Sequence, residues 1–171
     1  IATVNNSCFG GSNGSAVVTA AGGTGSLEYS IDGVNFQSSN TFNGLSAGGY
    51  IFYVKDLGGC GNATVAYITQ PEQIKISLGV LNVAPCNGDE NGRIIVNATG
   101  GTGAYTYSIN GTNYFGSNTF TGLNGGSYTV YVKDAAGCVE TATALVNEPT
   151  NLVIASTTTD VSCTGGNNGV I

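Results

Sequence analysis

The sequence predicts an all-β protein built from tandem antiparallel β-sandwiches that are joined end to end. Landmark residues recur after 78 positions, so that Cys8 returns as Cys86 and Cys60 returns as Cys138 (86 − 8 and 138 − 60). Short segments alternate apolar and polar residues with a period of two, which is typical of strands and not of helices. Glycine-rich breaks separate these segments, and the chain holds 28 glycines in 171 residues.

The recurrence divides the chain into residues 1–72, residues 73–150, and residues 151–171 as the start of a truncated third copy. The first two copies align without a gap from their first cysteine to the proline near their end. A period of this length corresponds to one small domain per repeat, and we expect the sequence to be a window on a longer array. The connections at Pro71 and Pro149 are short and stiffened by proline, which predicts limited freedom between neighbouring repeats.

The expected strands follow in the same order in both copies. In the second copy they are residues 93–98, 105–109, 118–120, 128–133 and 141–146, followed by the first strand of the next copy. The residues expected to face the core are Ile94, Val96, Ala98, Tyr105, Tyr107, Ile109, Tyr128, Val130 and Val132. About seven short strands per repeat, with a turn every 8–12 residues, indicate an antiparallel sandwich.

A leucine-and-glycine corner precedes a tyrosine in each copy, at residues 45–50 and 123–128. This arrangement is similar to the tyrosine corner of immunoglobulin-type sandwiches, in which the tyrosine hydroxyl bonds back to the loop. The predicted fold class is therefore a tandem, end-to-end array of immunoglobulin-like antiparallel β-sandwiches.

Composition argues against several classes of partner. Charged residues make up 8% of the chain and the net charge is −6, whereas soluble domains usually carry ~25% charged residues. Only four basic residues are present, which argues against nucleic acid and against an anionic membrane surface. No segment approaches the ~20 apolar residues that a membrane-spanning helix needs, so this segment is not expected to insert into a membrane.

The chain offers little to catalysis, and we expect no enzyme activity, no cofactor and no metal site. It has no histidine, so a serine or cysteine nucleophile would have no imidazole base. Calcium prefers six to eight oxygen ligands, and the ten acidic residues form no dense cluster in the sequence. Asp56 and Asp134 are the only acidic residues that align between the two copies, and Asp32 lies in a loop. We interpret these aspartates as turn residues that bond to nearby backbone.

Cysteines recur at fixed places, and their spacing without any histidine indicates disulfides and an oxidising, extracytoplasmic setting. The candidates are Cys8, Cys60, Cys86, Cys138 and Cys163. In-repeat pairing would join Cys8 to Cys60 and Cys86 to Cys138. However, Cys8 is expected at one end of its sandwich and Cys60 at the other, separated by a strand of about 20 Å, whereas a disulfide needs Cα atoms within ~7 Å.

A second pairing joins neighbouring repeats. If the repeats stack end to end, Cys8 of the first copy meets Cys138 of the second, and the other three cysteines are left for further repeats. The sequence leaves the in-repeat and the inter-repeat pairing open.

Aromatic side chains offer a possible surface contact. Tyr53 and Tyr131 are expected on the outer face of the strand that holds Lys55 and Lys133, near aromatic residues of the hairpin loop. A flat aromatic face can stack on sugar rings, although such tyrosines more often cover a sheet face or the edge of a neighbour.

The second copy resembles the SprB repeat over residues 100–111 (GGTGAYTYSING), 117–123 (SNTFTGL), 126–130 (GSYTV) and 133–138 (KDAAGC). The resemblance extends over both full copies and the opening of the third. SprB repeats occur in very large cell-surface adhesins of gliding Bacteroidota, and the family motif carries no catalytic residues. Membership implies type IX secretion, an extracellular location at the cell surface, and a role in attachment or gliding motility.

Two functions are therefore expected to compete. The first is the structural stalk of a surface adhesin or filament, whose partners are neighbouring repeats of the same chain. The second is an array of glycan-binding modules that recognise surface polysaccharide. Self-association into fibres is a further expectation.

Overall fold

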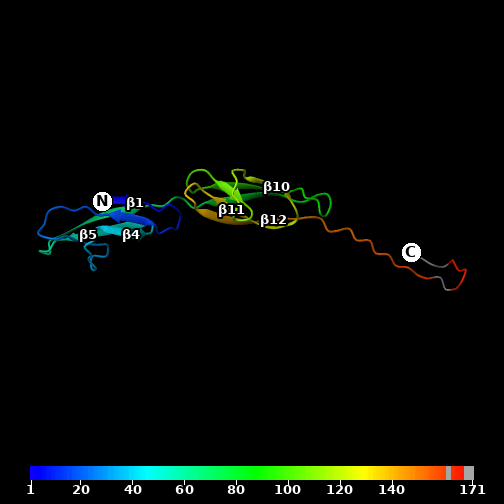
Figure 1. Cartoon of the computed structure of the whole chain (residues 1–171), viewed down its shortest axis with the longest axis horizontal. Helices are drawn as coiled ribbons and strands as arrows, with labels where there is room; N and C mark the ends of the chain where they lie inside the picture. The colour runs from blue at the N-terminus through cyan, green and yellow to red at the C-terminus, as the bar shows by residue number, and fades with distance from the viewer. Residues whose placement is uncertain (161–162, 168–171) are drawn as a thin grey trace.

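The computed structural model describes residues 1–160 and 163–167, and all of the regular elements in this part are β-strands (Figure 1). Repeat 1 (residues 1–72) holds β1 (Ala2–Val4), β2 (Gly14–Val17), β3 (Glu28–Ser30), β4 (Thr41–Leu45), β5 (Gly48–Lys55) and β6 (Gly61–Ile68). Repeat 2 (residues 73–150) holds β7 (Lys75–Leu81), β8 (Gly92–Thr99), β9 (Thr106–Ser108), β10 (Thr119–Leu123), β11 (Gly126–Lys133) and β12 (Val139–Val146). The two repeats follow one another along the long axis of the molecule.

Each repeat consists of two three-stranded antiparallel sheets. In repeat 1 the sheets have the orders β1-β2-β4 and β3-β5-β6, and in repeat 2 the corresponding orders are β7-β8-β10 and β9-β11-β12. In immunoglobulin nomenclature these are strands A, B and E opposite strands C, F and G. The predicted immunoglobulin-like sandwich is confirmed. Six strands form in each repeat instead of about seven, and an isolated bridge pairs Tyr29 with Gln37 and Tyr107 with Phe115 after the third strand.

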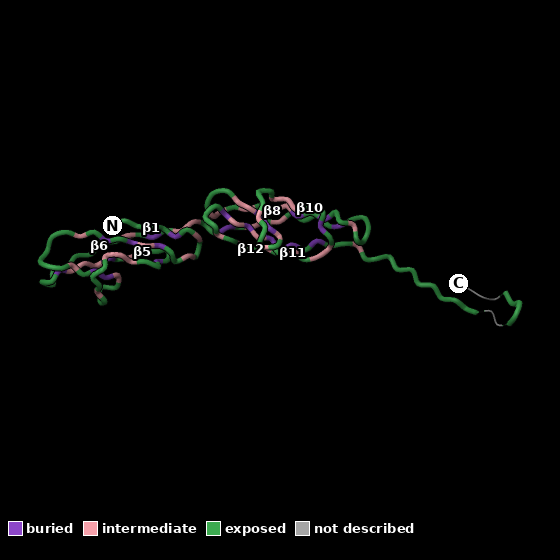
Figure 2. The backbone as a smooth tube through the Cα atoms, in the orientation of Figure 1, coloured by how far each residue is buried: buried purple, intermediate pink, exposed green. Residues whose placement is uncertain are grey.

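In strands such as β2 and β8, alternation places one side chain of every two in the core of the sandwich (Figure 2). In β11, Val130 and Val132 are buried, while Thr129 is exposed and Tyr131 lies on the outer face. In repeat 1 the core centres on Phe52, whose ring lies 5.3 Å from that of Phe42. The predicted core residues of repeat 2 all belong to its core cluster or pack against it. Each repeat therefore has a core of its own.

The tyrosine corner is present in both repeats. The hydroxyl of Tyr50 donates to the carbonyl oxygen of Ser46 at 3.0 Å, and the hydroxyl of Tyr128 donates to that of Asn124 at 3.0 Å. Both bonds fix the turn that leads into the long strand β5 or β11. These strands end at the turns that carry Cys60 and Cys138, so the corner anchors the strand that leads to each of these cysteines.

Replacement of the central aromatic residue tests whether repeat 1 depends on this core. We expect Phe52→Ala to lower the free energy of unfolding of repeat 1 by about 3–5 kcal/mol, because a large buried side chain is lost and a cavity remains. Urea unfolding monitored by fluorescence and circular dichroism measures the change. Val34→Ala is the control, since Val34 is 80% exposed, and a similar loss in both variants would contradict the assignment.

Candidate functional site: the disulfide-bonded junction between the repeats

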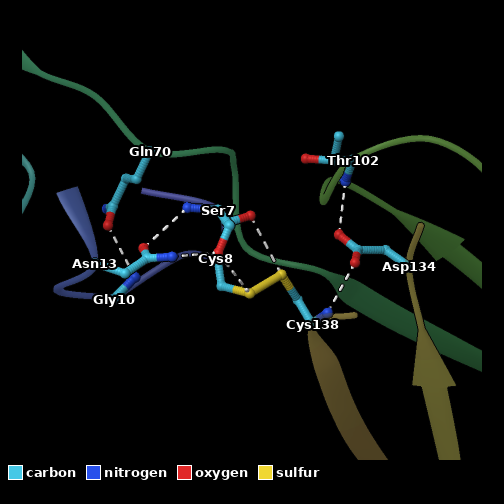
Figure 3. Close-up of a disulfide and its surroundings, with 8 residues drawn as sticks. All are labelled: Ser7, Cys8, Gly10, Asn13, Gln70, Thr102, Asp134 and Cys138. Carbon is cyan, nitrogen blue, oxygen red and sulfur yellow. Dashed lines mark hydrogen bonds between the residues drawn. A yellow bond between two sulfur atoms is a disulfide. The ribbon is translucent and has the colours of Figure 1, made fainter. Parts of the chain in front are cut away.

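A disulfide joins Cys8 of repeat 1 to Cys138 of repeat 2, across 130 residues of sequence (Figure 3). Cys8 lies in the loop between β1 and β2, and Cys138 lies in the turn between β11 and β12. The two Cα atoms are 5.6 Å apart, which is within the range that a disulfide requires. Of the two pairings that the sequence leaves open, the structure contains the inter-repeat one.

The in-repeat pairs Cys8–Cys60 and Cys86–Cys138 are not formed, and this alternative is corrected by the structure. The physical reason is that the loop after the first strand and the turn after the fifth strand lie at opposite ends of one sandwich. Cys60, Cys86 and Cys163 are exposed free thiols.

Hydrogen bonds from its own repeat hold the loop that carries Cys8. The buried Asn6 accepts from the backbone N–H of Gly14 through Oδ1 at 2.8 Å, and its own N–H donates to the carbonyl of Thr69 at 2.9 Å. Asn13 accepts from the N–H of Ser7 at 3.1 Å. A loop that is bonded at both ends presents Cys8 in one place, so the disulfide forms between positioned partners.

Asp134 organises the turn that carries Cys138. One carboxylate oxygen accepts from the N–H of Cys138 at 2.9 Å, and the other accepts from the N–H of Thr102 at 2.8 Å. The N–H of Asp134 donates back to the carbonyl of Cys138 at 3.0 Å. The Asp134 side chain thus closes its own turn and links that turn to the glycine-rich corner that begins at Gly100 (Figure 3).

The linker between the repeats is tied to both of them. On the side of repeat 1, Oε1 of Gln70 accepts from the N–H of Gly10 at 2.8 Å. On the side of repeat 2, the carbonyl of Glu72 accepts from the N–H of Gly101 at 2.9 Å. Ile74 then enters the core of repeat 2 with 6% of its surface exposed. The short, bonded linker agrees with the predicted limit on freedom between repeats.

A cavity of about 320 Å³ lies in this junction, between the disulfide, Phe9, the linker and the turn of Asp134. Among the residues that the structure describes, no group of three or more His, Cys, Asp or Glu is placed to hold a metal ion. The features that define the junction are therefore its disulfide and the hydrogen bonds between side chains and backbone around it.

Both halves of the junction recur at the outer ends of the two repeats. Asp56 accepts from the N–H groups of Thr24 and Cys60, each at 2.8 Å, which reproduces the arrangement around Asp134. At the far end of repeat 2, Asn87 donates to the carbonyl of Pro149 at 2.9 Å and so ties the loop of Cys86 to the next linker. Each repeat therefore carries one cysteine of the Cys8 type and one of the Cys138 type.

The aspartates act as turn residues, as predicted from the sequence. Asp32 accepts from the side chain of Asn35 and from the N–H groups of Val34 and Asn35, which hold the pKa of its carboxyl far below the ordinary value. The N–H groups of Thr24 and Cys60 likewise lower the pKa of Asp56. The bonds from Asp56 and Asp134 to residues 24 and 102 span 32 positions, a long-range role that the turn interpretation missed. Asp56 and Asp134 align between the two copies, and this alignment was the signal in the sequence that could have indicated the long-range role.

Tyr53 and Tyr131 lie on the outer face, as expected, but they are half-buried. Each ring lies close over a glycine of the neighbouring loop, Gly33 for Tyr53 and Gly111 for Tyr131. Nearby, the Nζ of Lys55 lies 4.1 Å from the ring centre of Phe36, and that of Lys133 lies 3.8 Å from the ring centre of Tyr114. These rings thus pack on loops and lysines of their own repeat. A contact with polysaccharide remains a prediction.

The comparisons with known proteins agree with the resemblance seen in the sequence. The family model of the SprB repeat matches residues 1–36 and residues 84–113, one stretch in each repeat. Each repeat is thus similar to the SprB repeat over part of its length. No curated protein matches the chain.

Solved structures give weaker likenesses. The amphioxus IgVJ-C2 molecule is 12% identical with a TM-score of 0.32, over 80% of this chain and 97% of that chain. The fibronectin(III)-like modules of CbhA from Clostridium thermocellum are 14% identical with a TM-score of 0.28, over 78% and 84%. Domains 4–9 of the surface layer protein SbsC are 13% identical with a TM-score of 0.26, over 86% and 27%. These scores are low, so the fold assignment rests on the strand order of the chain itself.

Peptide mapping tests the disulfide directly. The four basic residues, Lys55, Lys75, Arg93 and Lys133, divide a tryptic digest so that Cys8, Cys60, Cys86 and Cys138 fall in four different peptides. Under non-reducing conditions we expect residues 1–55 to be linked to residues 134–171. Cys163 shares the last of these peptides, so the map is made with Cys163→Ser. A link between residues 1–55 and 56–75 would instead establish the in-repeat pair.

The lowered pKa of Asp56 predicts an acid-sensitive turn. The carboxylate is favoured in the folded state, so its contribution to stability is complete above the ordinary pKa of 3.8 and is lost as the pH falls below that value. We expect the stability of repeat 1 to fall less steeply from pH 4 to pH 2 in Asp56→Asn than in the unmodified protein, because Asn cannot titrate. Urea midpoints measured across this range provide the comparison, and equal slopes would contradict the role of Asp56.

Proposed function

We propose that this chain is a segment of an extended stalk on the cell surface, in which disulfides between neighbouring repeats resist extension. The observation that carries the proposal is the Cys8–Cys138 bond, which links two sandwiches that have separate cores. Such a segment spans distance and transmits force to whatever it displays. Attachment and gliding motility are the processes that this stalk would serve, after export by type IX secretion.

Similarity to the SprB repeat supports a surface location. SprB repeats belong to cell-surface proteins, and such repeat families are generally non-enzymatic. Among the described residues, no helix is long and apolar enough to cross a membrane. An inter-repeat disulfide is consistent with an oxidising exterior.

The position of the disulfide determines how tension passes through the chain. Force applied at the two ends of this segment enters along residues 1–8, crosses the sulfur–sulfur bond, and leaves along residues 138–171. The 129 residues between the two cysteines carry no covalent tension, because the disulfide is the shorter path. They include β2 to β11, and hence most of both cores. The disulfide thus protects the sandwiches from being drawn out.

Without the disulfide the same tension would pass through every strand. A sandwich of about 70 residues lengthens by roughly 200 Å when it unfolds, since an extended chain spans at most ~3.3–3.6 Å per residue. Unfolding would then lengthen the stalk, and the applied force would no longer be transmitted along it. With the disulfide intact, the bonded pair keeps its length under load, which suits a stalk that must transmit movement.

Single-molecule pulling tests this proposal. We expect the oxidised protein, held at its two ends, to show no extension event larger than about 140 Å, which is the reach of the ~40 residues outside the bonded loop. Cys8→Ser/Cys138→Ser should show two events of roughly 200 Å each, one for each sandwich.

Cys60→Ser/Cys86→Ser is the matched control, because it removes two cysteines and leaves the disulfide intact, and it should behave as the unmodified protein does. Two large events in the oxidised, unmodified protein would contradict the mechanical role.

A further inference from the structure

On the outer face of repeat 2, Lys133 has no acidic partner. It lies at the end of β11, opposite Thr106 of β9. In repeat 1 the corresponding residues are Lys55 and Glu28, whose Nζ and carboxylate oxygen lie 3.1 Å apart. That contact is the one ion pair within the part of the chain that the structure describes. The hydroxyl of Thr106 donates instead to the carbonyl of Lys133 at 3.3 Å, and no carboxylate neutralises the ammonium group.

Two acidic side chains near Lys133 are engaged elsewhere. Asp134 follows it in the sequence, but both of its carboxylate oxygens accept from backbone N–H groups. Glu140 lies opposite Val132 of β11 and therefore on the core side of the sheet, because Val132 is buried. Its carboxylate accepts from the side chain of Gln73 at 3.3 Å. Lys133 is thus a free positive charge in a chain whose net charge is −6.

Two tyrosines flank this lysine. The Nζ of Lys133 lies 3.8 Å from the ring centre of Tyr114. Tyr131 lies two residues before Lys133 in β11, on the same face, and its ring covers Gly111. Both tyrosines are half-buried, so part of each ring reaches the surface. An aromatic ring offers an apolar face to the C–H groups of a sugar, and the tyrosine hydroxyl can hydrogen-bond to a polar group.

Threonines occupy the face beside these tyrosines. Thr141 lies opposite Tyr131, and Thr143 lies opposite Thr129, in the pairing of β12 with β11. All three threonines are exposed. Each hydroxyl can donate one hydrogen bond and accept others, which suits the hydroxyl groups of a sugar. The face thus combines one cation, two aromatic rings and a group of hydroxyls.

Repeat 1 differs at this face, although its strands pair in the same order. At the repeat spacing of 78, the positions of the three threonines hold exposed apolar residues, namely Ile51, Ala63 and Val65. The lysine of repeat 1 is neutralised by Glu28. The sandwich therefore forms without the threonines and without a free lysine. These groups of repeat 2 thus point to a role other than folding.

We propose that this sugar face of repeat 2, made of Tyr114, Thr129, Tyr131, Lys133 and Thr141, binds an acidic sugar unit of a polysaccharide. The anionic group of the sugar pairs with the ammonium of Lys133. The C–H groups of the sugar ring pack against a tyrosine, and the sugar hydroxyls bond to the threonines. Binding of this kind adds a lateral contact to the stalk and leaves the disulfide-bonded junction as it is.

A sugar fits this face better than a peptide does. Peptides that bind to sheets commonly add a strand at an edge and use backbone hydrogen bonds. β11 is instead the central strand of its sheet, with β9 on one side and β12 on the other. Recognition at the sugar face must therefore use side chains, and the groups present are hydroxyls, rings and one cation.

The scarcity of basic residues agrees with a single sugar acid as the ligand. Nucleic acid binding relies on many phosphate contacts at once, and the chain has four basic residues in all. One acidic sugar needs only one cation. Because an exposed ion pair contributes little on its own, we expect a dissociation constant on the order of 1 mM that rises with salt.

An NMR titration with oligogalacturonate tests the proposal, because amide shifts locate even weak binding. We expect the shifts to concentrate on β11 and β12 of repeat 2 and to leave repeat 1 unchanged. Thr106→Glu should weaken binding about fivefold, since the new carboxylate then neutralises Lys133 as Glu28 neutralises the lysine of repeat 1. Repeat 1 shows that the fold accepts glutamate at this position. Thr121→Glu is the matched control, because it adds the same charge at an exposed position of the opposite sheet, and it should leave binding unchanged.

Three further probes separate the parts of the proposal. A sulfated dextran oligomer should bind at the same face, because a sulfate can replace the sugar carboxylate, whereas unmodified dextran and polyglutamate should not. Equal shifts with polyglutamate would reduce the site to a simple charge contact and would overturn the sugar assignment. Absence of shifts with both acidic sugars, or equal weakening by the two glutamate variants, would overturn the site itself. The variants leave the Cys8–Cys138 bond intact, so failure here would leave the mechanical proposal standing.

Discussion

The opposite placement of two turns in the immunoglobulin-like sandwich governs the junction. The loop between the first two strands lies at one end of each repeat, and the turn between the last two strands lies at the other. When repeats are joined head to tail by a linker of a few residues, the first loop of one repeat meets the last turn of the next. The bond between Cys8 and Cys138 follows from this arrangement. The same arrangement keeps Cys8 away from Cys60, the other cysteine of its own repeat.

The loop that carries Cys8 and the turn that carries Cys138 are each held in place by hydrogen bonds within their own repeat. Asn6 and Asn13 fix the backbone around Cys8, and Asp134 fixes the backbone around Cys138. Because these side chains bond to backbone N–H groups, they satisfy donors that a loop would otherwise leave to water. Because the backbone around both cysteines is already ordered, less conformational entropy is lost when the two repeats are joined. It also explains why an array with few charged residues can hold neighbours in place without ion pairs across the junction.

Much of this fold could be predicted from the sequence, because period-two alternation and glycine-rich turns report directly on local structure. The inward rows of β8 and β11 and the corners at Tyr50 and Tyr128 are cases in which local pattern and final structure agree. The choice of disulfide was harder, because it depends on how two domains are placed relative to each other. Spacing alone favours neither pairing. The long-range bond of Asp134 to Thr102 escaped prediction for the same reason, since its partner lies 32 residues away.

The central claim is that the Cys8–Cys138 bond holds the two repeats in one fixed relation. Residual dipolar couplings, measured by NMR for both repeats in a weakly aligned sample, test it most directly. In the oxidised protein one alignment tensor should fit the couplings of both sandwiches, and after reduction the two tensors should differ. Independent tensors in the oxidised protein would show that the repeats move freely despite the bond, and would contradict the account.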